Sequence, residues 1–196
     1  MKWALDSGYG FGCCEVAAQL AGNVVEHLER EAQYTVKALE LMPMHDVRNP
    51  SAALTAVVNQ ARQAAYAGGS ITPYAAAIDR LWQDFSRELG SKPTLAWRIG
   101  PAFLAGINLG AAYMRCYLRL QHPATIQNLD GALLWLGKLR NPGAGNQPPP
   151  GFTIDFNAKI AEIKSQYQSG GSAGLPTVAD FIDALRGNIK DQFPPP

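Results

Sequence analysis

The sequence predicts an all-α protein: a bundle of about five helices followed by a C-terminal two-helix hairpin. Apolar residues recur at helical spacing along most of the 196 residues. Glycine and proline interrupt this pattern at distances typical of helices, and strand-type alternation is weak. We therefore expect a main helical bundle over 1–140, a Pro/Gly-rich linker over 141–152 and a helical hairpin over 153–192.

The first third of the chain predicts two helices after a glycine-rich lead. Residues 6–12 contain three glycines and are expected to be a flexible lead-in. A helix is predicted over about 13–42, ended by Pro43, which cannot continue it. A second helix is predicted over about 52–67, with Ser51 as its N-cap.

The third helix has the clearest pattern in the chain. Thr72 and Pro73 mark its start, and Gly90 marks its end. Its apolar stripe consists of Ile78, Leu81, Trp82, Phe85 and Leu89. A short turn over 93–98 is expected to follow it.

The fourth helix, over about 101–121, carries small residues at four-residue intervals: Ala102, Gly106 and Gly110. Each glycine lowers helix propensity by about 1 kcal/mol relative to alanine. Small residues at this spacing allow a neighbouring backbone to approach closely. We therefore expect these three positions to pack against another helix.

A fifth helix is predicted over about 124–139, before the Pro/Gly-rich linker. Beyond the linker, short amphipathic helices are predicted over about 154–168 and from Thr177 onward. A hairpin of this size cannot bury enough surface to fold alone. We expect it to dock on the bundle or on a partner.

Positive charge is concentrated in one part of the chain. Residues 91–140 carry six Lys or Arg against the single acid Asp130, a formal charge of +5 in a chain of net charge +1. The candidate face comprises Arg115, Arg119, His122, Lys138 and Arg140. On a continuous helix Arg115 and Arg119 would be one turn apart.

Three interpretations of this face are open. It could contact RNA or DNA backbone, because neutralised phosphates release counterions. It could bind an acidic protein. It could also pair within the chain with Glu26, Glu29 and Glu31, in surface salt bridges that contribute little individually.

Other motifs do not indicate an active site or a metal site. The glycines of 8–12 are typical of a phosphate-binding turn, but the preceding strand and the following Lys-Ser/Thr are missing. Cys13 and Cys14 are expected near a helix N-terminus, with His27 too far along the same helix to act as a base. Glu26, His27 and Glu31 do not form the Glu-x-x-His motif of di-iron bundles. We predict no catalytic residues, no metal and no cofactor.

Composition predicts a globular, cytoplasmic protein. Charged residues make up only 17% of the chain, which favours a subunit whose surface is partly covered by others. The N-terminus has no signal-peptide pattern, and the longest apolar stretch, 99–114, is shorter than the roughly 20 residues that span a bilayer. The three cysteines are odd in number, which favours a reducing compartment over a disulfide framework.

We therefore expect a non-catalytic helical subunit of a larger assembly, with other protein subunits as partners. Its basic and aromatic face would contact RNA or DNA backbone, as small helical subunits of ribonucleoprotein effector complexes do. The alternative is a structural or adaptor protein, such as a phage or secretion-machine component, whose basic face meets acidic protein.

Overall fold

The computed structural model describes residues 1–43, 46–92, 98–141, 143 and 153–193. These residues form α-helices and one short 3-10 helix and contain no strand, so the predicted all-α class is confirmed. The elements are α1 (Lys2–Leu20), α2 (Glu26–Leu41), α3 (Ser51–Tyr66), η1 (Thr72–Tyr74), α4 (Ala75–Gly90), α6 (Ile99–Tyr117), α7 (Ala124–Arg140), α8 (Phe156–Ser169) and α9 (Gly171–Gln192). No helix in these described ranges is long and apolar enough to cross a membrane.

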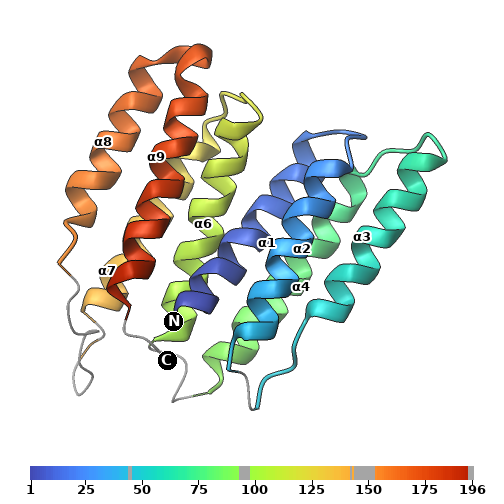
Figure 1. The fold of residues 1–196 in the computed structure, drawn as a ribbon, viewed down its shortest axis with the longest axis horizontal. Coiled ribbons are helices and arrows are strands. Elements are labelled where there is room, and N and C mark those ends of the chain that lie inside the picture. Colours follow the sequence, from blue (N-terminus) through green and yellow to red (C-terminus); the bar gives the residue numbers. More distant parts are fainter. Residues whose placement is uncertain (44–45, 93–97, 142, 144–152, 194–196) are drawn as a thin grey trace.

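Helices α1 and α6 form the central pair of the bundle (Figure 1). Helices α2 and α4 pack on α1, and α3 lies outside them at one edge of the molecule. Helices α7 and α9 pack on α6, and α8 lies against both at the opposite edge. The C-terminal pair, α8 and α9, is thus part of the same packed body as the preceding helices.

The α1–α6 pair is packed backbone against backbone through four glycines. A Cβ at Gly8 or Gly12 of α1 would lie 2.0 or 2.2 Å from a carbonyl oxygen of α6. A Cβ at Gly106 or Gly110 of α6 would lie 2.2 or 2.0 Å from a carbonyl oxygen of α1. Real Cβ atoms do not come this close to backbone, so only glycine fits at these positions.

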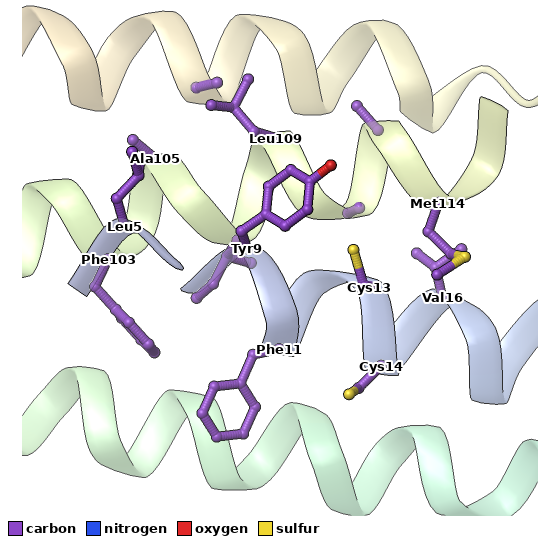
Figure 2. Packing of buried hydrophobic residues seen from close by; sticks show 14 of the residues in the cluster. Leu5, Tyr9, Phe11, Cys13, Cys14, Val16, Phe103, Ala105, Leu109 and Met114 are labelled. Carbon is purple, nitrogen blue, oxygen red and sulfur yellow. The ribbon is translucent and has the colours of Figure 1, made fainter. Parts of the chain in front are cut away.

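Aromatic side chains fill the space beside this glycine contact. Figure 2 shows Phe11 and Tyr9 projecting from opposite sides of α1. The Phe11 ring meets Phe103 of α6 edge-on at 6.0 Å, and Phe103 in turn meets Phe85 of α4 at 5.0 Å. All three phenylalanines are buried, and they join α4 to the central pair.

The structure corrects the prediction for the N-terminal region. The glycine-rich segment 6–12 lies inside α1 and is not a lead-in, because packing against α6 offsets the low helix propensity of its glycines. The single helix expected over 13–42 is two helices, α1 and α2. The chain turns between them at residues 21–25, where Gly22 has a φ of 63°.

Two further boundaries differ from the prediction. Helix α6 ends at Tyr117, four residues before the expected end at Gln121. Helix α9 begins at Gly171 and contains Pro176, whereas a spacer was expected as far as Thr177. The linker at 141–152, apart from Asn141 and Gly143, and the turn at 93–98, apart from Arg98, lie outside the described residues.

Candidate functional site

Arg115, the first residue of the predicted basic face, is buried. Its side chain lies between α6 and α7, where Nη1 donates hydrogen bonds to Asn128 Oδ1 and to the Ala111 carbonyl oxygen at 3.4 Å. Burial lowers the pKa of its guanidinium. Arg115 therefore ties α6 to α7 and does not present its charge to solvent.

Arg119 and His122 lie in the connection between α6 and α7. Because α6 ends at Tyr117 and Arg119 has a φ of 58°, Arg119 is not one helical turn beyond Arg115 on the same face, which corrects that prediction. His122 is held locally: its Nδ1 accepts a hydrogen bond from the Ala124 amide at 3.2 Å, and Tyr167 of α8 bonds to its backbone.

Lys138 and Arg140 lie at the far end of α7, about 21 and 24 Å along the helix axis from its first residue, Ala124. Lys138 Nζ lies 4.0 Å from the centre of the Trp135 ring, and Arg140 Nη1 donates to the Ile154 carbonyl oxygen at 3.5 Å. The five basic residues are therefore dispersed and do not line one surface.

A different set of side chains, from α1, α2, α6 and α9, comes together between α2 and α9. Four rings follow one another at contact distance from α1 across α6 to α2. Tyr9 lies 5.4 Å from Tyr113, Tyr113 stacks on Tyr117 at 5.6 Å, and Tyr117 meets His27 edge-on at 5.6 Å. We call these four residues the aromatic row.

Two arginines pack on the aromatic row from opposite walls. Arg186 of α9 lies over the Tyr9 ring at 4.6 Å and donates a hydrogen bond to the Tyr34 hydroxyl of α2. Arg30 of α2 lies over the Tyr117 ring at 5.1 Å and donates to the Tyr117 hydroxyl at 3.3 Å. The hydrogen bond to Tyr117 is the main reason that the pKa of Arg30 is above its usual value.

Carboxylates balance these arginines. Arg186 Nη1 lies 2.8 Å from Asp6 Oδ1, and its Nη2 lies 2.8 Å from Asp183. The Asp6 side chain is only 4% exposed and also contacts Lys190 of α9. Arg30 lies 2.8 Å from Glu31. Because Asp6 of α1 pairs with both Arg186 and Lys190 of α9, its carboxylate fixes α9 to α1.

Three pockets are lined in part by residues of the aromatic row. The first, of about 170 Å³, is lined by Tyr9, Arg30, Glu31, Tyr34, Tyr113, Asp183 and Arg186. The second, of about 420 Å³, is lined by His27, Tyr117, Leu118, Arg119, Pro176 and Asp180. The third, of about 150 Å³, shares His27 and Leu118 with the second and adds Leu20, Ala21, Val24 and Leu120. We call the first two together the α2–α9 groove, and the third the apolar pocket.

Burial disfavours the ionised form of three tyrosines of the groove, Tyr9, Tyr34 and Tyr113. Burial raises the pKa of Tyr113 to about 12, and it also raises the pKa of Tyr9 and Tyr34 above the usual range. These phenols are neutral near pH 7 and serve as hydrogen-bonding and packing groups.

The cysteines lie in the core. Cys13 and Cys14 occur in the middle of α1, where burial raises the pKa of both thiols, so the predicted position near a helix N-terminus is wrong. Cys13 Sγ lies 3.3 Å from the Gly110 carbonyl oxygen. Within the described part of the chain, no group of three or more His, Cys, Asp or Glu side chains is placed to hold a metal ion.

Sequence reasoning missed Tyr9, Tyr34 and Arg186, which come from helices far apart in the chain. A usable signal was the four-residue spacing of Tyr113 and Tyr117, which aligns both rings on one helix face. Nothing local indicates that Arg186 would meet that face. Only the packing of α9 on α6 brings it there.

Comparison with known proteins does not assign this chain to a family. The function of the α2–α9 groove must therefore be argued from its own geometry. No family model, no curated protein and no solved structure matches the chain.

Proposed function

We propose that this protein is a non-catalytic helical subunit that binds a segment of a protein partner along the α2–α9 groove. The observation that carries the proposal is the aromatic row with arginine packed on it from both walls. Tyrosine and arginine are enriched among the residues that dominate binding energy in protein interfaces. Rings already held by neighbouring rings lose little conformational freedom when a partner binds.

The charges of the groove favour polypeptide over nucleic acid. Arg30 and Arg186 each lie against a carboxylate, and Asp180 lines the second pocket together with Arg119. A phosphate chain laid along this groove would meet acids as often as bases. A polypeptide segment offers both signs of charge, together with apolar side chains that pack on the tyrosine rings.

Nucleic-acid binding is the second candidate. The stacked pair Tyr113 and Tyr117 favours it, because bases stack on such rings without regard to sequence. The formal charge of +5 over residues 91–140 points the same way, although its arginines and lysines are dispersed in the fold.

Site-specific photocrosslinking in cells of the source organism tests the proposal. The Tyr117→p-benzoylphenylalanine variant places the probe in the groove, where Tyr117 is 39% exposed. The matched control is Tyr66→p-benzoylphenylalanine, where Tyr66 is 81% exposed at the end of α3, the helix at the edge of the bundle (Figure 1). We expect discrete protein adducts from position 117, insensitive to nuclease and absent from position 66.

Two results would contradict the proposal. Adducts from position 117 that disappear on nuclease treatment would assign the groove to nucleic acid. Equal adducts from both positions, or none from position 117, would show that the groove is not a specific binding surface.

A further inference from the structure

Arg119 occupies a backbone position that favours glycine. It lies just past α6 with a φ of 58°, and its amide donates to the Cys116 carbonyl oxygen at 2.9 Å. The next amide, of Leu120, donates to the Arg115 carbonyl oxygen at 2.8 Å. This pair of bonds is the Schellman helix ending, in which the left-handed residue is usually glycine because a Cβ is strained there.

In the described part of the chain, the Arg119 side chain forms no ion pair that would offset this backbone strain. Among the described residues, no carboxylate lies within 4 Å of its guanidinium. Arg30 and Arg186, by contrast, both have acidic partners. Strained residues retained against local preference cluster at binding sites. Of the three arginines that line the groove, Arg119 is therefore the one whose charge is available to a ligand.

The surroundings of Arg119 combine charge with apolar surface. Its pocket of about 420 Å³ includes Tyr117 and His27, and the adjoining apolar pocket of about 150 Å³ is open at Val24, which is 46% exposed. The two pockets share His27 and Leu118, so they lie next to each other. A single chain segment can therefore reach both.

We propose that this end of the groove is a specificity site for a partner segment that carries an acidic residue close to an aliphatic or aromatic one. Arg119 binds the carboxylate, and the apolar pocket receives the neighbouring side chain. This inference rests on the proposed function, because it presumes that the groove binds polypeptide. Beyond that function, it states which kind of peptide sequence the groove selects.

Selection from a random 12-residue peptide library against the full chain tests the inference. We expect the selected peptides to share Asp or Glu within three positions of Leu, Ile, Met or Phe. A synthetic peptide of that consensus should lose about tenfold or more in affinity when Arg119→Gly is introduced, as expected for a charge-assisted hydrogen bond. The same peptide with Gln in place of its acid should bind wild type and Arg119→Gly equally.

The Arg119→Gly variant separates binding from folding. Glycine relieves the left-handed strain, so its Tm should equal or exceed that of the wild type while acidic-peptide binding falls. Asp180→Asn should raise affinity for the acidic peptide, because it removes a negative charge from the lining of the same pocket. Arg87→Ala, which removes an exposed arginine on α4, should leave affinity unchanged.

The outcomes distinguish this inference from the proposed function. Selected peptides that lack a shared acid, or that bind Arg119→Gly as tightly as wild type, would overturn the inference if Tyr117→Ala still weakens their binding. No selected peptides, or peptides indifferent to Tyr117→Ala, would overturn the inference and the proposed function together.

Discussion

The helix pairs α1–α6 and α2–α9 show two opposite ways of placing helices beside each other. Between α1 and α6, glycines bring the backbones into contact, so no side chain or ligand fits between them. Between α2 and α9, arginine and tyrosine side chains span the distance, as in the bond from Arg186 to Tyr34. The first pair determines where the helices lie. The second leaves pockets along its length, and this is where we expect binding.

Replacement of Gly106 by alanine should cause the largest loss of stability, because it forces the α1 and α6 backbones apart. The new Cβ would lie 2.2 Å from the Leu5 carbonyl oxygen, and neither backbone can move away without disturbing the core. Overpacking of this kind costs about 1–3 kcal/mol, occasionally more, and because the added Cβ meets backbone we expect Gly106→Ala to cost more than about 3 kcal/mol. Urea unfolding monitored by circular dichroism measures the loss.

The matched control is Gly137→Ala on α7, where an added Cβ meets nothing within 4 Å. The same chemical change should there stabilise the protein by up to about 1 kcal/mol, because alanine has the higher helix propensity. Equal effects at the two positions would mean that the α1–α6 backbones are not in contact.

Removal of the buried carboxylate of Asp6 should have the next largest effect. Asp6→Ala leaves Arg186 and Lys190 without their shared acidic partner between α1 and α9. Breaking a buried ion pair from one side typically costs about 3–5 kcal/mol, and we expect about 3 here because both cations keep some contact with solvent. Asp183→Ala is the control: its side chain is 48% exposed, so it should cost less than about 1 kcal/mol. A smaller loss for Asp6→Ala than for Asp183→Ala would contradict this account of how α9 is attached.

The smallest expected effect concerns Glu15, on the side of α1 that faces α4. Burial raises the pKa of Glu15, although the Trp82 indole donates to Glu15 Oε2 at 3.1 Å and opposes the shift. When the pKa of a carboxyl is higher in the folded state than in the unfolded state, the protein loses stability as the pH rises above the unfolded pKa, here near 4.5. We therefore expect Glu15→Gln to be as stable as wild type below pH 4.5 and more stable near pH 7, by less than about 1 kcal/mol. Thermal melts at both pH values check this, and a wild type that gains stability relative to Glu15→Gln as the pH rises would contradict it.

The sequence predicted the elements whose signals are local. The apolar stripe from Ile78 to Leu89 and its terminal glycine match α4, and the helix predicted over 52–67 matches α3 within one residue. The α1 region was missed because a helix containing Gly8, Gly10 and Gly12 is disfavoured by local propensity. Its stability depends on α6, whose glycines have the same four-residue spacing. The matched spacing at 8–12 and 106–110 was the available signal.

The candidate site was less predictable than the fold. Charge counting identified Arg115 and Arg119 but could not show that α6 ends between them, or that Asn128 binds the first. Exposure of a charge depends on which helix packs over it, and that is decided by long-range contacts. The aromatic row likewise joins α1, α6 and α2, so no single segment records it.

The glycine contact also has a consequence for the order of folding during synthesis. Leu5 and Gly106 are about 100 residues apart, so α1 leaves the ribosome long before the helix that stabilises it. An isolated helix of this length with three glycines is marginal in water. The α1 segment can therefore complete its packing only after α6 has been translated, although α2 and α4, which also pack on it, are made earlier.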